Sequence, residues 1–392
     1  MAKILRIITR LNVGGPAIHA ILLDSELNKN GHTDILVTGT VSDSEGDMFY
    51  LAKDKGVTPV VVSDLGREIS FKKDLKAFFA LYKLMRKEKP DIVHTHTAKA
   101  GTLGRLAAIL AGVPVKVHTF HGHIFDGYFS PFRAKIFILI EKLLALFTDR
   151  VVVLSDSVKN DIVNRLKISS PDKSVVVPLG LELEKFLNSG PSKGNFRRKL
   201  GVSDDMLLVG IIGRLVPIKN HKVFLDAVRK IKDTDSRMKV RFVIVGDGEL
   251  RFELKAYTKK LNIEEMVIFT GWVENLAEVY VDLDLVALTS LNEGTPVSLI
   301  EAMASSRAVI ATDVGGIKDL ITDNVNGILV RSADADDISS KLISLLKDEE
   351  RRKRLGLNGR KMVMTKYTKE RLVKNIGSLY DGLMVRRAGD RC

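Results

Sequence analysis

Cysteine is almost missing from this sequence. Among 392 residues there is one, Cys392, at the final position. A single cysteine excludes a disulfide within the chain, and it rules out a zinc site built from several thiolates. Such sparing use of cysteine is typical of a reducing compartment.

Long apolar runs are missing as well. The longest candidate, Ile136–Phe147, is shorter than the ~18 residues that span a bilayer and contains Glu141 and Lys142. The opening stretch is interrupted by Arg6 and Arg10 and has no small-residue cleavage site, unlike a secretory signal. We therefore expect a cytoplasmic protein that is not integral to a membrane.

Acidic residues are too few to balance the basic ones, and the net charge is +13. Such an excess attracts polyanions. No zinc finger, RNA-recognition signature or Arg/aromatic array occurs, so we expect an anionic membrane surface rather than nucleic acid. The segment 125–150 combines aromatic, apolar and basic residues and suits either peripheral membrane docking or a buried helix. The basic segment 67–76 suits docking too.

Strand and helix patterns alternate along the chain, as is typical of a parallel sheet wrapped by helices. The alternation stops at the polar stretch "NSGPSKGN" and then restarts. With 45% hydrophobic residues the chain can form two cores. We predict an α/β protein of two Rossmann-like, doubly wound domains that face each other across a cleft. The expected divisions are residues 1–187, residues 188–367, and a helical segment 368–392 that packs back on the first domain.

Two turns after predicted strands suit phosphate binding. In "LNVGGPAIHA", Gly14 and Gly15 allow close approach of a ligand and a helix begins near Pro16, although a plain tight turn fits equally. In "GRLVPIKN", Arg214 and Lys219 precede a helix that Asn220 can cap. Cations there oppose the helix dipole, so a pyrophosphate between them is a better explanation than solvation alone.

Two carboxylates bracket a helix start in "LNEGTPVSLIEAMA". Thr295 is the expected N-cap and Pro296 the first helical residue. Glu293 precedes the cap, and Glu301 lies four residues after Val297 on the same helix face. One acid can contact a sugar, the other can accept hydrogen bonds from a ribose diol, and the N–H groups between them can hold a phosphate. A helix with one incidental surface Glu fits the spacing too.

Histidines gather in a short part of the sequence: His94, His96, His118, His121 and His123. His94 and His96 alternate on a strand and could ligate a metal, but no cysteine or nearby acid supports this, so we predict no metal. His121 is best placed to bond a sugar, although any of them could be a core residue.

Two other motifs are rejected. "GDGELR" lacks the third glycine of a dinucleotide fingerprint. Asp282 and Asp284 resemble a metal-nucleotide Asp-x-Asp, but their position indicates the end of a helix and the start of a strand.

Taken in order, "GRLVPIKN", "VGDGELR", "FTGWVENLAEVY", "SLNEGTPVSLIEAMASSRAVIATDVGG" and "NGILV" resemble the retaining, metal-independent glycosyltransferases of family four. This large family has the GT-B fold and includes bacterial polysaccharide and lipopolysaccharide enzymes. The resemblance covers most of the chain, and the two glutamates match the family's Glu, seven residues, Glu motif. Many relatives have Phe-Gly after the first Glu, where this chain has Gly294-Thr295-Pro296.

The resemblance implies roles for individual residues. Catalytic roles fall on His121, Arg214, Lys219 and Glu293. Donor binding falls on Gly15, Arg214, Lys219, Trp272, Val273, Glu293, Thr295, Pro296, Val297 and Glu301. Acceptor contacts are expected at Asn12, His94 and Lys99.

The same resemblance implies the activity. A UDP- or GDP-sugar would donate its sugar, with retention of configuration and without a metal or other cofactor, to a glycan or lipid-linked acceptor. Closure of the two domains would bring Gly15 and His121 against the donor. The alternatives are a sugar-nucleotide epimerase or phosphorylase on this fold, or a non-catalytic sugar-binding protein.

Overall fold

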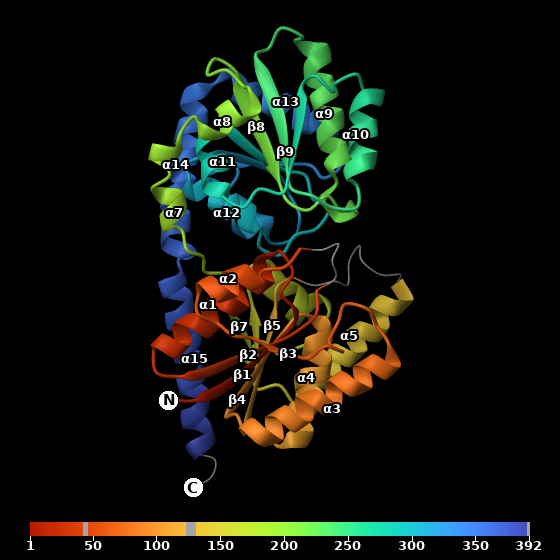
Figure 1. Ribbon diagram of the computed structural model, residues 1–392, viewed down its shortest axis with the longest axis vertical. Helices are drawn as coiled ribbons and strands as arrows, with labels where there is room; N and C mark the ends of the chain where they lie inside the picture. The colour runs from red at the N-terminus through yellow and green to blue at the C-terminus, as the bar shows by residue number, and fades with distance from the viewer. Residues whose placement is uncertain (42–45, 123–130, 390–392) are drawn as a thin grey trace. The chain divides into compact units, whose positions relative to one another are not determined.

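A computed structural model describes residues 1–41, 46–122 and 131–389 (Figure 1). His123, Cys392 and the first residues of the segment 125–150 lie outside this range. The chain divides into two compact units. Unit 1 contains Met1–Leu181 and Tyr367–Cys392, and unit 2 contains Glu182–Lys366.

Unit 1 contains a parallel sheet in the order β3-β2-β1-β4-β5-β6-β7. Its strands are β1 (Lys3–Arg10), β2 (Thr33–Gly39), β3 (Val60–Val61), β4 (Ile92–His96), β5 (Val115–Phe120), β6 (Arg150–Val153) and β7 (Ser174–Val176). Its helices are α1 (Gly15–Lys29), α2 (Phe49–Asp54), α3 (Phe71–Glu88), α4 (Ala98–Ala111), α5 (Pro131–Leu146), α6 (Asp156–Asn160), the π-helical turn η1 (Asp161–Arg165) and α15 (Lys369–Gly389).

The two faces of the unit 1 sheet are covered by different helices. Alternate residues of β1 point to opposite faces, as a strand requires. Ile4 packs with α1 and with Leu372 and Ile376 of α15. Leu5 and Ile7 pack with α3 and α4. Figure 1 shows α15 beside α1, while α3, α4 and α5 cover the other face.

Unit 2 contains a second parallel sheet, in the order β10-β9-β8-β11-β12-β13. Its strands are β8 (Leu207–Ile212), β9 (Val240–Val245), β10 (Val267–Gly271), β11 (Leu285–Leu288), β12 (Ala308–Thr312) and β13 (Ile328–Val330). Its helices are α7 (Glu184–Leu187), α8 (Asn195–Leu200), α9 (His221–Thr234), α10 (Arg251–Lys260), α11 (Leu276–Asp282), α12 (Val297–Ala304), α13 (Ala335–Lys347) and α14 (Glu349–Lys366), with 3₁₀ turns η2 (Gly190–Ser192), η3 (Pro217–Lys219) and η4 (Gly315–Asp319). The prediction of two doubly wound parallel-sheet domains is confirmed.

The structure divides the chain between Leu181 and Glu182, six residues before the boundary expected from the sequence. The polar stretch proposed as a linker belongs to unit 2, where it forms η2 and leads into α8. The backbone N–H groups of Gly194 and Arg197 both donate to the carboxylate of Asp282, at 2.5 and 3.0 Å. Apolar residues are scarce there because backbone and side-chain hydrogen bonds, rather than burial, fix the segment.

None of the described helices combines the length and the apolar character that crossing a bilayer requires.

Candidate functional site

In unit 2 the sheet has one point where strand order reverses. From β8 the chain builds outward through β9 and β10, and it then returns to place β11 on the other side of β8. Ligands of open parallel sheets bind beyond the carboxyl ends of the strands at such a reversal. The segment after β8 contains Arg214 and Lys219, and the segment after β11 contains Glu293. Three predicted catalytic residues therefore follow the two strands that flank the reversal.

Lys219 and Glu293 form an ion pair at this point. Nζ of Lys219 lies 2.5 Å from Oε1 of Glu293, and both side chains are largely buried. Ser290 donates its hydroxyl to the same carboxylate oxygen at 2.6 Å. Oε1 therefore accepts from both partners, which fixes the glutamate's orientation.

The two segments are also joined through their backbones. The hydroxyl of Thr289 lies 3.2 and 3.1 Å from the carbonyl oxygens of Lys219 and Asn220. The N–H of Leu291 donates to the carbonyl of Ile218 at 2.9 Å. Because these bonds link the turn after β8 to the turn after β11, the separation of Lys219 from Glu293 does not depend on the flexible lysine chain alone.

Arg214 is half-buried at the end of β8. Within the described part of the chain, no ion pair of its guanidinium is recorded. This cation could therefore bind a ligand phosphate. The expected cap at Asn220 needs a correction: Asn220 is the N-cap of α9, but its φ is 48° and its side chain makes no capping hydrogen bond.

The start of α12 differs by one residue from the prediction. Pro296 is the N-cap and Val297 the first helical residue, and no side chain caps the helix. Pro296 has no N–H but its fixed φ suits the position before the helix. The hydroxyl oxygen of Thr295 is buried and has no hydrogen-bond partner among the described residues. A buried hydroxyl without a partner needs a ligand or a water molecule to complete it.

Glu301 lies inside α12 and is 8% exposed. The hydroxyl of Tyr280 donates to its Oε2 at 3.1 Å. Burial raises the pKa of Glu301 to about 7, although Lys185 and the bond from Tyr280 act in the opposite direction. The carboxyl group is therefore close to half ionised at neutral pH, unlike an ordinary surface glutamate.

Glu293 is further fixed by the turn after β12. The N–H of Gly316 donates to the carbonyl of Glu293 at 3.0 Å. Gly315 has a φ of +51°, and a Cβ there would lie 2.0 Å from that carbonyl oxygen. Only glycine allows this approach.

Trp272 and Val273 follow β10, at the edge of the unit 2 sheet. The Trp272 side chain is 49% exposed, so an apolar ring surface is open to a ligand. The sequence placed both residues near the nucleotide base; this remains a prediction.

The two rejected motifs have structural functions. Asp282 ends α11, and Asp284 lies directly before β11 and pairs with Arg197 at 2.7 Å. This agrees with the interpretation of "DLD" as a helix end and a strand start. In "GDGELR", a Cβ on Gly246 would lie 2.0 Å from the carbonyl oxygen of Gly213, so the glycine permits two turns to touch.

Unit 1 has its own reversal of strand order, between β1 and β4. Asn12 and the uncapped start of α1 at Gly15 follow β1. Thr97, the N-cap of α4, follows β4 and has a φ of 66°, which β-branched residues rarely adopt. Its hydroxyl lies 2.7 Å from that of Thr9, so a bond between the two strand ends accompanies this conformation.

A polar network crosses the interior of unit 1. Arg6 is fully buried, pairs with Asp34 and reaches Tyr380 of α15 at 3.3 Å. His94 is also fully buried; its Nδ1 lies 2.5 Å from the Tyr380 hydroxyl and its Nε2 lies 2.7 Å from Thr119. Both ring nitrogens of His94 therefore have partners inside unit 1, which leaves neither to contact the expected acceptor. Its partners are those of a core residue.

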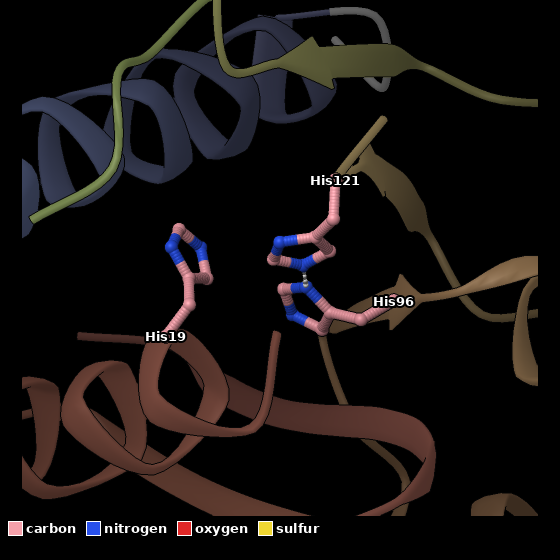
Figure 2. A group of neighbouring side chains, drawn as sticks. All are labelled: His19, His96 and His121. Atoms are coloured by element: carbon pink, nitrogen blue, oxygen red, sulfur yellow. Dashed lines mark hydrogen bonds between the residues drawn. The ribbon is translucent and has the colours of Figure 1, made fainter. Parts of the chain in front are cut away.

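His19, His96 and His121 lie together at the ends of α1, β4 and β5 (Figure 2). Nδ1 of His96 lies 3.0 Å from Nε2 of His121, and the ring of His19 lies edge-on to both. Burial lowers the pKa of His121 to about 3 and that of His19 and His96 well below the ordinary value. All three imidazoles are therefore neutral at pH 7.

One nitrogen of each of these imidazoles lies within 4.8 Å of the others, a spacing that a transition metal could bridge. However, a guanidinium nitrogen of Arg6 lies 3.2 Å from Nε2 of His96. In the described part of the chain no carboxylate joins the group. Arg6, which is paired with Asp34, already occupies Nε2 of His96, so this imidazole has only Nδ1 to offer a metal.

Lys99 has partners of its own. Its ammonium lies 2.5 Å from Asp74 and also donates to the carbonyl of Glu68. Its side chain is 14% exposed. These bonds tie α4 to the start of α3 and use two of the three N–H donors of the Lys99 ammonium.

Sequence reasoning missed three residues of these sites. Ser290 has an ordinary strand-end sequence, and Tyr380 lies almost three hundred positions from its partner His94. His19 is a single histidine in an apolar helical pattern. Nothing in its own neighbourhood indicates that it meets His96 and His121, because the contact depends on the sheet order.

Comparisons with known proteins identify a family for each unit of the chain. The family described as "Glycosyl transferases group 1" matches residues 192–362, and that described as "Glycosyltransferase Family 4" matches residues 13–185. These matches fall almost entirely on unit 2 and unit 1 respectively.

Two relatives have specific names. An Escherichia coli UDP-Gal:alpha-D-GlcNAc-diphosphoundecaprenol alpha-1,3-galactosyltransferase is 33% identical over 336 residues, which cover 85% of this chain and 86% of that one. A Campylobacter jejuni alpha-1,4-N-acetyl-D-galactosaminyltransferase, which is named for a PP-undecaprenol glycan, is 31% identical over 92% of this chain and 93% of its own.

Among solved structures, Anabaena HepE in complex with UDP and glucose has a TM-score of 0.84 at 19% identity, covering 97% of this chain and 100% of that one. This likeness confirms the predicted GT-B fold. Together with the identity to the galactosyltransferase over most of both chains, it establishes what kind of protein this is: the chain belongs to the group 1 glycosyltransferases of family four and is an enzyme that uses nucleotide-sugar donors.

Proposed function

We propose that this enzyme transfers a hexose from a UDP- or GDP-sugar, with retention of configuration, to a lipid-linked or glycan acceptor in the synthesis of a bacterial surface polysaccharide. The observation that carries the proposal is the Lys219–Glu293 pair at the strand reversal of unit 2. It places a cation and a carboxylate side by side where a phosphate and a sugar hydroxyl would lie.

The charges suit departure of a nucleoside diphosphate. Arg214 and Lys219 would bind the diphosphate, and the uncapped N–H groups at Val297 would add their dipoles. Negative charge grows on the leaving group as the sugar bond breaks, and donors fixed in advance stabilise that charge best. Two cations and a helix start supply this stabilisation, so we propose a transfer reaction that needs no metal.

The carboxylates have different tasks in this proposal. Glu293, fixed by Lys219 and Ser290, would accept from a hydroxyl of the transferred sugar. Glu301, buried beside Tyr280, would accept from the ribose hydroxyls when ionised. Thr295 would complete its buried hydroxyl on the sugar or phosphate. Trp272 and Val273 would contact the base.

For unit 1 we propose acceptor binding near its own strand reversal, where Asn12 lies. His94 and Lys99 are less suitable, because both are occupied inside the unit. The donor contacts of Gly15 and His121 stay predictions from the family resemblance.

The relatives' names support a lipid-linked acceptor. Both specific relatives act on glycans attached to undecaprenol through a diphosphate. An acceptor of that kind lies in a membrane, so we propose that the enzyme works at the inner face of the cytoplasmic membrane.

A thermal-shift screen tests the donor site. UDP, GDP and ADP, with their sugar forms, are added to the wild type and to Lys219→Met. A ligand that binds only folded protein raises the melting temperature. We expect one nucleotide to raise it in the wild type and to do so much less in the variant. No shift with any nucleotide would contradict the proposed donor site.

A transfer assay tests the chemistry. The stabilising nucleotide-sugar is supplied with undecaprenyl-diphosphate-linked N-acetylglucosamine, with and without EDTA. We expect product of retained anomeric configuration in equal amounts under both conditions. Inversion, or loss of activity that added metal restores, would contradict the mechanism.

A further inference from the structure

Helix α5 carries a stripe of exposed apolar side chains. Every third or fourth residue contributes to it: Phe132, Ile136, Leu139, Leu143 and Leu146, whose exposed fractions are 73, 44, 58, 54 and 69%. This spacing puts all five on one face of the helix. Single exposed apolar residues are ordinary on protein surfaces, but a stripe along four turns indicates a contact with something apolar.

The other face of α5 is firmly packed, so the stripe is not the result of a loosely placed helix. Ala134, Leu144 and Ala145 are buried in unit 1. Glu141 is also buried and forms an ion pair with Arg105 of α4 at 2.5 Å. Because that pair fixes the rotation of α5, the stripe points away from the core.

The neighbouring helix α4 extends the stripe into a wider apolar face. Leu106 and Leu110 of α4, which packs beside α5, are 42 and 67% exposed. Cations accompany it, since Arg133 and Lys135 of α5 are exposed as well. We call Leu106, Leu110 and the α5 stripe together the apolar face.

The apolar face ends at a basic pocket. This pocket lies at the amino ends of β5, β6 and β7, whereas the proposed acceptor site lies at the carboxyl ends of the strands. Its volume is about 720 Å³. The cations lining it are Lys116, Arg150, Lys173, Arg386 and Arg387, and the carboxylate is that of Asp149. Leu146 and Phe147 line the pocket too, and both are largely exposed, so apolar and basic surfaces are continuous there.

The cations of the pocket are held in two ways. Lys173 donates to the last carbonyls of α5, at Ala145 and Leu146, at 3.0 and 2.9 Å. Arg387 of α15 pairs with Asp149 at 2.8 Å. Arg386, next to it, is exposed. One carboxylate among five cations leaves a positive excess, and an anion is the ligand that such a pocket favours.

We propose that the basic pocket and the apolar face together bind an anionic phospholipid bilayer, with headgroup phosphates in the pocket and acyl chains against the stripe. An apolar strip bordered by lysine and arginine is the surface that binds at a membrane interface. A second copy of the chain fits less well, because pairing this face with itself would bring like charges together.

This inference rests on the proposed function, since a membrane surface is where a lipid-linked acceptor lies. The inference adds a binding site at the amino ends of the unit 1 strands, opposite the carboxyl ends where the proposed acceptor site lies. Helix α5, which carries the stripe, runs from the carboxyl ends of the strands to their amino ends, because it follows the end of β5 and leads to the start of β6.

Vesicle co-sedimentation tests the proposal. Wild-type enzyme is mixed with vesicles of equal parts phosphatidylglycerol and phosphatidylcholine, or of phosphatidylcholine alone, at 0.1 M and 0.5 M salt. We expect binding to the anionic vesicles that weakens at high salt, because salt screens exposed charges.

Two double variants separate the parts of the surface. Leu139→Ser with Leu143→Ser alters the stripe, and Arg150→Gln with Arg386→Gln alters the pocket. Each charge near an anionic surface contributes about 1 kcal/mol, so the pocket variant should bind about tenfold or more weakly and show a smaller salt dependence. The stripe variant should lose binding at both salt concentrations. Control variants in unit 2, Phe252→Ser and Lys259→Glu, change exposed residues far from this surface in sequence and should bind like the wild type.

Several outcomes would overturn the proposal: no binding of the wild type to anionic vesicles, unchanged binding of both double variants, or equal losses in the controls. Light scattering that shows a dimer dispersed by the stripe substitutions would assign the face to a second copy instead. Circular dichroism checks folding; if the pocket variant does not fold, the stripe variant, which changes only exposed side chains, decides. The nucleotide-induced thermal shift is measured in parallel, so failure of the donor site is distinguished from failure of the membrane site.

Discussion

Nζ of Lys219 lies 2.5 Å from Oε1 of Glu293, a residue 74 positions away along the chain. The pair joins the segments that follow β8 and β11, the two strands between which the order of the sheet reverses. In the proposed function, this pair places a cation for the diphosphate next to a carboxylate for the sugar.

Substitution of Lys219 by Met should weaken nucleoside diphosphate binding by about 10- to 100-fold, because a hydrogen bond between charged groups contributes roughly 1.5–3 kcal/mol. The measurement is the dissociation constant from calorimetry. Lys222→Met is the matched control: Lys222 lies one turn further on and pairs with Glu253 on the surface. Equal losses in the two variants would contradict a specific role for Lys219.

Much of this site could be predicted from the sequence because the signals are local. Strands such as "TDILVTG" and "GILV" are buried, short and bounded by turn residues, and the structure has them at β2 and β13. Arg214, Lys219 and Glu293 stand out because charges in turns after buried strands have no structural need. The regular alternation of strands and helices was enough to predict the fold class.

The features that the sequence could not predict depend on contacts between residues far apart along the chain. β3 has only two residues, both exposed, and β7 has only three, so both strands are too short to leave a clear pattern. His19 meets His121 only because α1 packs beside the ends of β4 and β5. The N-cap of α12 was placed one residue early, because Pro fits both the N-cap and the first helical position and no side chain caps this helix.

Nucleotide affinity should depend on pH through Glu301. Burial raises the pKa of Glu301 to about 7, so below pH 7 the carboxyl becomes protonated and accepts ribose hydrogen bonds less well. We expect wild-type affinity for the stabilising nucleoside to fall by up to about tenfold per pH unit below 7. Glu301→Gln should bind weakly with a flat profile, whereas Glu253→Gln should retain the wild-type profile. Using the nucleoside avoids titration of phosphates. An unchanged profile in Glu301→Gln would contradict this assignment.

Gly315 should tolerate no side chain. Its φ is +51°, and a Cβ would lie 2.0 Å from the carbonyl of Glu293. Gly315→Ala must therefore displace Glu293 or strain the backbone, at a cost of about 1–3 kcal/mol. We expect a lower melting temperature and a loss of transfer activity greater than the loss of nucleotide binding. Gly190→Ala, where a Cβ meets nothing within 4 Å, should leave both unchanged. Full activity of Gly315→Ala would contradict the close approach.

The folded state should lose stability in mild acid. Burial lowers the pKa of six histidines: His19, His94, His96, His118, His121 and His221. Each takes up a proton near pH 6.5 only when unfolded, so stability falls as pH drops below 6.5. Burial also raises the pKa of three carboxyls, Asp24, Asp34 and Glu301, and these oppose the effect between about pH 7 and pH 4.

Six histidines outweigh three carboxyls, so we expect the free energy of unfolding to decrease between pH 6.5 and pH 5. His19→Gln should reduce that slope by up to about 1.4 kcal/mol per pH unit. Urea unfolding at several pH values gives both slopes, and a single variant leaves the carboxyl contribution unchanged. Identical slopes would show that His19 is not buried in its neutral form.

The return of the chain to unit 1 has a consequence for synthesis on the ribosome. Unit 2 is continuous, whereas unit 1 receives α15 from the end of the chain. Until α15 is translated, the face of the sheet formed by Ile4 and its neighbours lacks Leu372 and Ile376, and the buried Arg6 and His94 lack Tyr380. We expect the first translated half to wait, incompletely folded, while the second half completes its own core. Unit 1 is therefore the first unit to be translated and the last to complete its fold. The nascent chain exposes this apolar surface until α15 has been made.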